Sequence, residues 1–432
     1  MARILIASQP IAGHLFPLLP IAGELVRRGH EVRWYTGRKY RARVRATGAR
    51  FEPFTLARDY DDADFGATFP GRDALSGLRQ VQFDVRHIFV GGIEDGLRDL
   101  QALAREWPWD VTLADQTLNA ALALEELGGP PCALLGVLPL GIHNPDAAPF
   151  GLGLAPRGGR LGRARNRALR WATQRVVFGD STREIGALYR RLGLPARGFE
   201  PPTAPSLMLQ ATARAFEYSL SDHPPQLHFI GPLIPPTPPG LLLPPWWADV
   251  TGGARPVVVV TQGTLATDPR DLIIPALRGL AGEDVLVVAA GVRDPTPLGT
   301  LGANARTAPF VPFSALLPHA QVYVSNGGYG GVQQALMHDL PVAVAGTTED
   351  KSEVARRVQV AGVGLRLGTR TPRPGQLRLA VLRLLSDPAP RLNAARLGAA
   401  LRAHDAPREA ADLLEVLIRT GGPVLAAPGR AV

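Results

Sequence analysis

The sequence predicts an α/β protein made of two doubly wound, Rossmann-like parallel-sheet domains. The chain has 432 residues, which is too long for one ordinary core and suits two domains of about 200 residues each. Each half opens with a continuously apolar run, residues 3–8 and residues 256–260, as expected of a parallel strand buried on both faces. A polar turn follows the first strand of each half, so the two halves are predicted to have similar folds that face each other.

A proline-rich segment separates the two halves. Seven prolines fall within residues 231–247, and so dense a run excludes both a helix and a central strand. The segment is expected to be a semi-rigid connector. The predicted units are residues 1–230 for the first domain, 231–255 for the linker, 256–408 for the second domain and 409–432 for a C-terminal helix and tail.

The first domain begins with a strand–helix–strand unit. After the strand at residues 3–8, a loop over residues 9–14 leads into a helix that runs to Arg28 and stops at Gly29. Residues 31–35 supply the next strand, which completes the opening of a doubly wound domain.

Two polar residues directly follow strands of this domain. Apolar runs at residues 109–114 and 132–137 predict two further strands around a helix over residues 118–127. The first of these strands ends at Asp115, and His14 comes just after the opening strand. Because ligands of open α/β sheets collect outside the carboxyl ends of the strands, we expect His14 and Asp115 to meet there.

A glycine-rich turn in the second domain is the strongest binding signal. The apolar run at residues 322–325 ends in Asn326, four of the next five residues are glycine, and a helix is expected over residues 332–338. A helix N-terminus behind glycines presents free backbone N–H groups and the positive end of the helix dipole, which suits a phosphate or a pyrophosphate. The other elements predicted here are strands at 285–290, 306–312 and 342–345, and short or terminal helices at 315–317 and 407–420.

The positive charge of the chain does not predict a nucleic-acid partner. The net charge is +9, but only two of the 47 basic residues are lysine, a bias typical of a GC-rich genome. The arginines are scattered, and the aromatic interleaving of a single-strand binder is missing. Residues 157–196 are predicted to form one or two Arg-rich helices with a solvated face; peripheral contact of residues 157–170 with an anionic membrane is the alternative.

Composition predicts a cytoplasmic protein. The single cysteine, Cys132, cannot form an internal disulfide. Three prolines interrupt the apolar N-terminus before Glu24, which excludes a signal peptide, and no apolar run approaches the roughly 20 residues of a membrane span. No Asp-x-Asp or His/Cys cluster occurs where a divalent ion would bridge a diphosphate, so no metal is expected.

Five motifs, in order, resemble the family-1 glycosyltransferases. These GT-B enzymes have two Rossmann-like domains on an interdomain cleft and move a sugar from a UDP or dTDP donor to an acceptor, and bacterial macrolide and other natural-product glycosyltransferases look closest. The resemblance covers nearly the whole chain. It rests on Gly13-His14 with Pro17, the TQGT turn at 261–264, Phe310-Val311-Pro312, the glycine-rich turn and Glu349-Asp350.

The resemblance implies an inverting transfer with His14 as general base and Asp115 as its orienting partner. An acceptor hydroxyl is a poor nucleophile at neutral pH, and an imidazole of pKa ~6.5 can take its proton during attack. A carboxylate on the other ring nitrogen fixes the tautomer and stabilises the imidazolium. The alternatives are a helix-start histidine without a chemical task and a strand-end Asx cap, and Asp110 competes with Asp115 although it precedes its strand.

The resemblance also implies a donor site in the second domain. Phe310 and Val311 fall where the base is bound, and a place in the core is the alternative for Phe310. Asp350 would accept hydrogen bonds from sugar hydroxyls, unless it only caps the helix that follows. The implied donor-site residues are Gly13, Gln262, Gly263, Thr264, Phe310, Val311, Asn326, Gly327, Gly328, Tyr329, Gly330, Gly331, Gln334, Glu349, Asp350 and Lys351.

Three residues depart from the family pattern. Asn326 stands where the family has histidine, so more of the stabilisation of the leaving diphosphate must come from the backbone of residues 327–332. Gln334 replaces a ribose-binding glutamate, and Lys351 replaces a glutamine that contacts the sugar. No cofactor is expected beyond the donor co-substrate, a UDP-sugar such as UDP-glucose or a dTDP-sugar.

The predicted activity is transfer of this sugar to a hydroxyl of a small hydrophobic acceptor. Residues 60–95 and 137–150, which include His87 and His143, are expected to shape the acceptor pocket. Two alternatives remain open: a GT-B epimerase or hydrolase of nucleotide sugars, and a non-catalytic partner protein that binds the donor.

Overall fold

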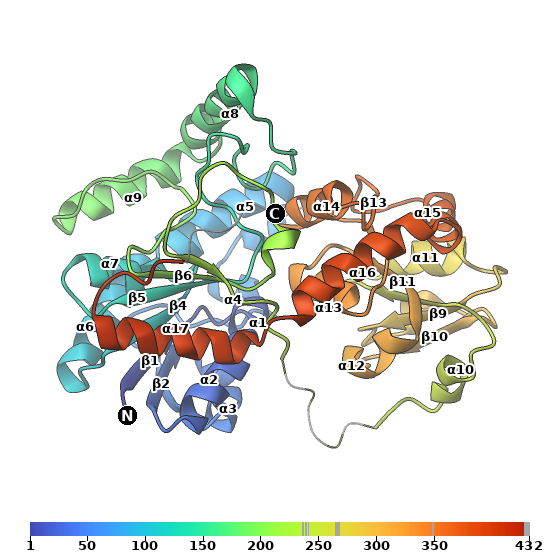
Figure 1. Ribbon diagram of the computed structural model, residues 1–432, viewed down its shortest axis with the longest axis horizontal. Coiled ribbons are helices and arrows are strands. Elements are labelled where there is room, and N and C mark those ends of the chain that lie inside the picture. Colours follow the sequence, from blue (N-terminus) through green and yellow to red (C-terminus); the bar gives the residue numbers. More distant parts are fainter. Residues whose placement is uncertain (236, 238–239, 241, 264–267, 348–349, 427–432) are drawn as a thin grey trace.

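Two parallel α/β domains lie side by side in the computed structural model (Figure 1). The structure describes residues 1–426 except 236, 238–239, 241, 264–267 and 348–349. The predicted fold class is confirmed: every strand pair of both sheets is parallel.

The first sheet has seven strands in the order β3-β2-β1-β4-β5-β6-β7. The strand order reverses between β1 and β4, where Ile4 lies opposite Val111 and Ala7 lies opposite Ala114. The carboxyl ends of β1 and β4 are therefore neighbours at the switch point, where open α/β sheets bind their ligands. The strands are β1 (Arg3–Ala7), β2 (Glu31–Thr36), β3 (Arg50–Pro53), β4 (Val111–Asp115), β5 (Cys132–Gly136), β6 (Leu207–Gln210) and β7 (Leu227–Phe229).

Helices cover both faces of this sheet. One face packs against α2, α3 and the C-terminal helix α17, and the other packs against α6 and α7. The helices along this part of the chain are α1 (Ala12–Leu15), α2 (Leu18–Arg27), η1 (Arg38–Tyr40), α3 (Arg41–Ala46), α4 (Phe65–Thr68), η2 (Arg72–Ala74), α5 (Gly77–Asp84), η3 (Val85–Val90), α6 (Ile93–Glu106), α7 (Asn119–Glu126), α8 (Gly159–Ala172), η4 (Thr173–Val177), α9 (Gly179–Arg191) and η5 (Arg214–Phe216).

The second sheet has six strands in the order β10-β9-β8-β11-β12-β13, and its order reverses between β8 and β11. Its strands are β8 (Val257–Thr261), β9 (Leu286–Ala290), β10 (Ala305–Ala308), β11 (Ala320–Ser325), β12 (Val342–Val344) and β13 (Gly364–Arg366). Its helices are α10 (Trp247–Thr251), α11 (Ile273–Gly279), η6 (Thr296–Leu298), α12 (Phe313–Leu316), η7 (Leu317–His319), α13 (Tyr329–Met337), α14 (Lys351–Val360), α15 (Pro374–Ser386) and α16 (Pro388–Arg402).

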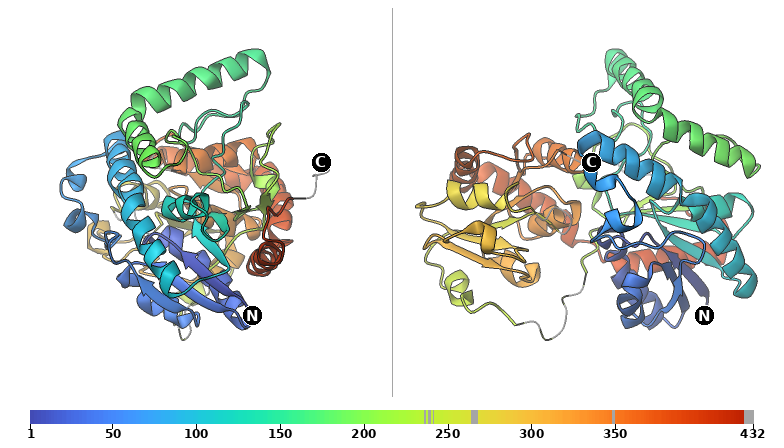
Figure 2. Two further views of the ribbon diagram at one scale, coloured as in Figure 1. Left: turned by 90° about the vertical axis from the view of Figure 1, so that its left-hand side faces the viewer. Right: turned by 180° about the vertical axis from the view of Figure 1, so that it is seen from behind.

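The C-terminal helix α17 (Ala406–Thr420) returns from the second domain to the first. It lies along α2 (Figures 1 and 2), and Arg28 joins it through a 2.6 Å contact between Nη1 and Asp412 Oδ1. His30 Nε2 lies 3.0 Å from Glu415 Oε1. Helix α17 therefore connects the second domain to the first.

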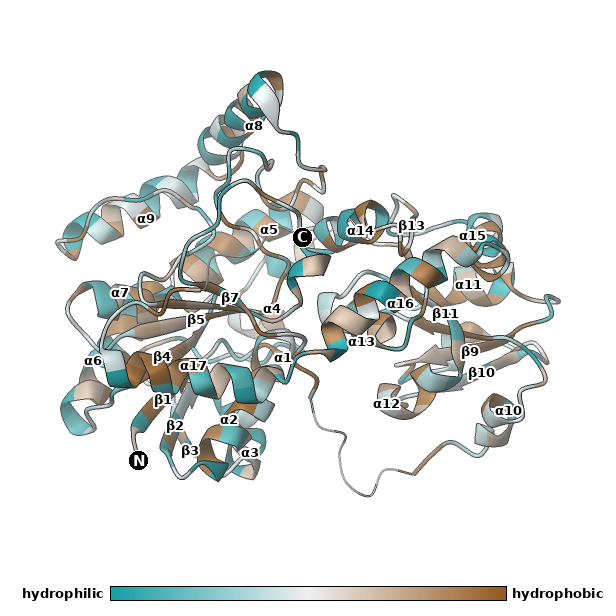
Figure 3. Cartoon of the chain, viewed as in Figure 1, coloured by the Kyte–Doolittle hydropathy of each residue, from teal (hydrophilic) through white to brown (hydrophobic). Residues whose placement is uncertain are grey.

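The Arg-rich stretch forms two helices, α8 and α9, that project from the first domain (Figures 1 and 2). Figure 3 shows that α8 is mostly hydrophilic, whereas the strands of the first sheet are hydrophobic. Arg163 is paired with Asp146 at 2.8 Å, and Arg170 donates to the carbonyl of Asn144 at 3.1 Å. Some of the arginines thus hold α8 to the domain. In the described residues, no helix is long and apolar enough to cross a membrane.

Most long elements lie where the sequence predicted them, with four kinds of difference. The loop expected over residues 9–14 contains the short helix α1, which carries His14. The short strands β3, β6, β7 and β13 lacked a clear sequence signal because each has only three or four residues. Helices α6, α15 and α16 were also missing from the prediction, and the strand predicted at 306–312 is wrong beyond residue 308, where β10 ends.

Candidate functional site

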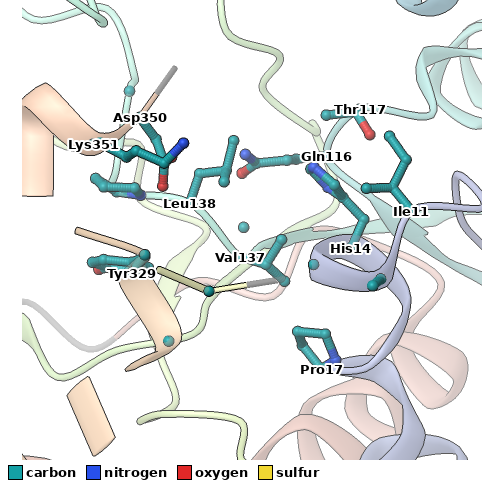
Figure 4. Close-up of a pocket in the computed structure, with 18 of the residues that line it drawn as sticks. Ile11, His14, Pro17, Gln116, Thr117, Val137, Leu138, Tyr329, Asp350 and Lys351 are labelled. Atoms are coloured by element: carbon teal, nitrogen blue, oxygen red, sulfur yellow. The ribbon is translucent and has the colours of Figure 1, made fainter. Parts of the chain in front are cut away.

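A cavity of about 1850 Å³ lies at the carboxyl ends of both sheets and is lined by residues of both domains. In Figure 4, His14 lies on one side of this cavity, and Asp350 and Lys351 lie on the other. The predicted site residues that line it are Gly13, His14, Gln262, Gly263, Phe310, Val311, Asn326, Gly328, Tyr329, Gly330, Gly331, Gln334, Asp350 and Lys351.

Four predicted residues are not among those that line the cavity. Asp115 lies behind His14, and Gly327 is buried inside the glycine-rich turn. Thr264 and Glu349 lie outside the described residues.

His14 and Asp115 form a hydrogen-bonded pair. Because β1 and β4 are adjacent, α1 after β1 places His14 Nδ1 2.9 Å from Asp115 Oδ1 at the end of β4. Asp115 is fully buried and His14 is 9% exposed. A carboxylate can only accept, so Nδ1 carries the proton and Nε2 is left to accept one.

Two opposing effects set the basicity of this histidine. Burial disfavours the imidazolium and alone would lower the pKa of His14, but the charge and hydrogen bond of Asp115, with a further contribution from the charge of Asp350, outweigh it. The pKa of His14 is therefore raised above its ordinary value. Asp350 belongs to the second domain, so the two sides of the cavity interact electrostatically.

Two neighbours of the pair were not anticipated from the sequence. The hydroxyl of Thr117 donates to Asp115 Oδ2, which fixes the second carboxylate oxygen. Gln116 lines the cavity beside His14. An Asp-x-Thr sequence at the end of a strand is the signal that could have identified Thr117. Asp110 is excluded as the partner, because its Oδ2 accepts from the backbone of Arg3 at 2.8 Å, at the opposite end of β4.

The glycine-rich turn joins β11 to the N-terminus of α13. Gly327 has a φ of +95°, and a Cβ there would lie 2.7 Å from Val344 Cγ1, so this position requires glycine. Nothing lies within 4 Å of the place of a Cβ at Gly328 or Gly330. Both glycines line the cavity, so the first turn of α13 borders it.

The side chains of Asn326 and Gln262, beside this turn, make hydrogen bonds to backbone groups of the second domain. Asn326, 9% exposed, donates from Nδ2 to the backbone carbonyl of Gln262 and so connects the turns after β8 and β11. Gln262 donates to the carbonyl of Asp268 at 2.7 Å and accepts from the N–H of Ile273 at 3.1 Å. These contacts shape the wall of the cavity on the side of the second domain.

Phe310 and Val311 differ in burial. Phe310 is 53% exposed and lines the cavity, so its assignment to the core is wrong. Val311 is 3% exposed and packs within a core cluster of the second domain. Gln334 is half-buried on α13 and lines the cavity.

Asp350 precedes α14 without capping it. It occupies the N-cap position, but its side chain makes no capping hydrogen bond, so the capping alternative is wrong. Lys351 begins the helix, and both side chains line the cavity. Both side chains therefore lie across the cavity from His14 (Figure 4).

The side of the cavity in the first domain includes a large apolar surface. Residues from α5, η3 and the chain around 137–152 contribute to it, including Leu78, Val81, Phe89 and Phe150. His143 lines the cavity as expected. The expectation for His87 is wrong: its side chain is exposed on η3, its ring lies 4.4 Å from that of Phe83, and it is not among the lining residues.

Known proteins show the same architecture and closely related sequences. Residues 273–417 match the family model described as the erythromycin biosynthesis protein CIII-like, C-terminal domain. The chain is 43% identical to 4'-demethylrebeccamycin synthase of Lentzea aerocolonigenes, over 96% of this chain and 100% of that relative. It is 32% identical to UDP-glycosyltransferase 2 of Phaeomoniella chlamydospora, over 96% and 95% of the two chains.

Solved structures agree with the fold. The glycosyltransferase of kitacinnamycin superposes with a TM-score of 0.73 at 26% identity, over 96% of this chain and 98% of its own. The calicheamicin glycosyltransferase superposes with a TM-score of 0.74 at 21% identity, over 98% and 100%, and supports the fold alone. With two parallel-sheet domains of this arrangement and a relative 43% identical over its whole length, the chain belongs to the family-1 glycosyltransferases of the GT-B fold.

Proposed function

We propose that the protein is an inverting glycosyltransferase that transfers a sugar from a UDP-sugar, or a dTDP-sugar, to a hydroxyl of a small hydrophobic acceptor. The observation that carries the proposal is the His14–Asp115 pair, which faces the N-terminus of α13 across one cavity. A base on one side and an anion-binding helix end on the other are the two groups that a direct displacement requires.

His14 is the general base of this proposal. The acceptor oxygen attacks the anomeric carbon, its proton moves to Nε2 of His14, and the bond between that carbon and the diphosphate oxygen breaks with its electrons on the diphosphate. Asp115 holds the proton on Nδ1 and stabilises the imidazolium that forms. Attack from the side opposite the leaving group inverts the anomeric centre.

The second domain holds the donor. The backbone N–H groups at the start of α13 and the helix dipole stabilise the departing diphosphate, which suits a turn whose Asn326 side chain is engaged with Gln262. The exposed ring of Phe310 stacks on the base, and Gln334 bonds the ribose. Asp350 accepts hydrogen bonds from sugar hydroxyls, and Lys351 adds a charge beside them. Relatives named UDP-glycosyltransferase and UDP-glucosyltransferase favour the UDP-sugar over the dTDP-sugar.

The acceptor lies in the apolar half of the cavity. Its aromatic and aliphatic lining favours a hydrophobic aglycone over a sugar or a peptide. The acceptor used by 4'-demethylrebeccamycin synthase is a rational first candidate, because that relative matches this chain over its whole length.

Nucleotide release from UDP-glucose in the presence of a panel of hydrophobic aglycones tests the proposal. We expect release that depends on the acceptor, together with a melting temperature that rises with UDP-sugar. Equal release without acceptor would favour the epimerase or hydrolase alternative. A donor-dependent melting shift without release under any condition would favour the non-catalytic partner protein that binds the donor, and the absence of both would contradict donor binding altogether.

A further inference from the structure

A buried ion network joins the two domains beside the cavity. Arg357 of α14, with a side chain 1% exposed, donates from Nε to Glu217 Oε2 at 2.7 Å and from Nη1 to Glu353 Oε2 at 3.0 Å. Glu217 precedes β7, and its side chain is 2% exposed. The Nη2 group of Arg357 donates to the carbonyl of Leu140 at 2.9 Å.

Glu217 in turn accepts from both domains. The hydroxyl of Tyr329, the first residue of α13, donates to Oε1 at 2.7 Å, and the backbone N–H of Leu140 donates to the same oxygen at 3.0 Å. The rings of Tyr329 and Phe216 stack with centroids 5.8 Å apart. The start of the proposed diphosphate-binding helix is thereby fixed to the first domain.

The N-terminus of α14 also holds a loop of the first domain. Glu353 Oε1 accepts from the N–H of Gly151 at 3.0 Å and from the N–H of Gly153 at 2.8 Å. Ser352 donates from its hydroxyl to the carbonyl of Gly151, and Arg356 donates from Nε to the carbonyl of Gly153, both at 2.8 Å. Both glycines thus have their N–H and C=O groups bound by one turn of helix.

These contacts connect the two substrate-binding sides of the cavity. Asp350 and Lys351, on the proposed donor side, directly precede Ser352 and Glu353. Gly151, with its neighbours Phe150 and Leu152, lines the cavity. A shift of α14 relative to this loop would therefore move the donor-sugar contacts and the wall of the acceptor pocket apart.

The network favours a single alignment of the domains. Removing one partner of a buried ion pair leaves an uncompensated charge, which is strongly unfavourable. Arg357 and Glu353 share a helix, but Glu217, Leu140 and the glycine loop lie on the other domain, so the hydrogen bonds are complete only when the domains meet in this arrangement.

We propose that Glu353, Arg357 and Glu217 are positioning residues. They lock the two domains in the alignment in which Asp350 and Lys351 face His14 across the cavity and the loop at 151–153 is held against α14. The catalytic part of this inference rests on the proposed function. The alignment of the domains by these residues does not rest on the proposed function, and the interdomain distance can be measured without any turnover.

Two glycine substitutions test the lock. Gly153 has a φ of +57°, and an added Cβ would lie 2.7 Å from the backbone oxygen of Ser352, so Gly153→Ala forces α14 away from the loop. Gly159 has a φ of +73° with nothing within 4 Å of a Cβ, so Gly159→Ala carries the same kind of backbone strain without the collision. The second variant is the matched control.

The interdomain distance is the first readout. Cys132 is fully buried, so spin labels can be placed on cysteines introduced at Leu127 of the first domain and Leu379 of the second, which are 40% and 67% exposed. We expect a narrow distance distribution for the unchanged background and for Gly159→Ala, and a broader, longer one for Gly153→Ala. Identical distributions for the two variants would overturn the proposal.

Kinetics is the second readout. We expect Gly153→Ala to lower kcat by roughly 10- to 100-fold. The Kd for UDP should stay within about twofold of wild type, because all the proposed donor contacts except Gly13 belong to the second domain. Glu353→Gln keeps an oxygen acceptor for the glycine N–H groups and should retain more activity than Glu353→Ala; equal loss in both would contradict the role of these hydrogen bonds. If Gly153→Ala does not fold, the comparison of Glu353→Gln with Glu353→Ala tests the lock instead, through the interdomain distance and kcat.

The outcomes also separate the lock from the proposed function. A shifted distance distribution in a protein that transfers no sugar would support the lock and refute the function. Normal transfer by a variant whose distance distribution is broadened would refute the positioning role.

Discussion

Replacing Asp115 by asparagine removes the carboxylate charge from the His14 pair while keeping a side chain of the same size. The hydrogen bond is 2.9 Å long and lies in a fully buried setting. A hydrogen bond to a charged group contributes roughly 1.5–3 kcal/mol, and the imidazolium forms only as the acceptor loses its proton. We therefore expect kcat to fall by about 10- to 150-fold, since each 1.36 kcal/mol is a factor of about ten.

Thr117 adds a second effect. Its hydroxyl donates to the other carboxylate oxygen, so an asparagine at position 115 would have one oxygen for two donors. When that oxygen faces Thr117, the amide N–H₂ faces His14 and favours the tautomer with the proton on Nε2, which cannot act as a base. The loss in kcat should then lie toward the upper end of the range.

The pH profile distinguishes this explanation from a general loss of structure. The base acts when it is deprotonated, so kcat/KM of the wild type should rise with pH through the raised pKa of His14. Asp115 is the principal group that raises this pKa, so the acid limb of Asp115→Asn should move to lower pH.

Initial rates of UDP release between about pH 5.5 and 9 measure both effects, with the melting temperature as a check on folding. Asp110→Asn is the control: that residue is bonded to Arg3 at the far end of β4, and its variant should keep the wild-type rate and profile. An unchanged acid limb, or a kcat within twofold of wild type for Asp115→Asn, would refute the reasoning.

Three further outcomes follow from particular contacts. Gly327→Ala combines a φ of +95° with a Cβ 2.7 Å from Val344, so we expect a loss of about 1–3 kcal/mol in the free energy of unfolding. Denaturant unfolding measures this loss. The control is Gly328→Ala, which has a φ of −61° and free space for a Cβ and should be nearly neutral for stability. Phe310→Ala removes a half-exposed ring from the cavity and should raise the Kd for UDP, measured by calorimetry, about 2- to 10-fold without lowering the melting temperature. An unchanged Kd would mean that the uracil ring does not stack on Phe310. Thr117→Val removes one hydrogen bond to Asp115 and should lower kcat about 2- to 10-fold, and an effect as large as that of Asp115→Asn would argue that Thr117 has a separate role.

The sequence was sufficient for the parts of the fold that place the base. Strands β1, β4, β8 and β11 are buried on both faces, so each appears as a continuous apolar run that can be located without a structure. Because the carboxyl ends of neighbouring parallel strands share one edge, the meeting of His14 and Asp115 followed from their positions after β1 and β4.

The interdomain contacts could not be predicted in this way. Glu217 and Arg357 are 140 residues apart, and charged side chains are usually exposed, so nothing in the local pattern indicates that both are buried. His87 was misassigned for a related reason: an irregular helical turn in η3 directs it outward, away from the cavity. The orientation of a side chain within such a turn depends on tertiary packing rather than on sequence period.

The central claim is that His14 takes the proton of the acceptor. The most direct measurement is the steady-state kcat for acceptor-dependent UDP release by His14→Ala, alongside its Kd for UDP. A general base contributes roughly 10²- to 10⁴-fold, so we expect kcat to fall by at least about 100-fold while the Kd for UDP and the melting temperature stay near those of wild type. Turnover of His14→Ala at the wild-type rate would contradict the account.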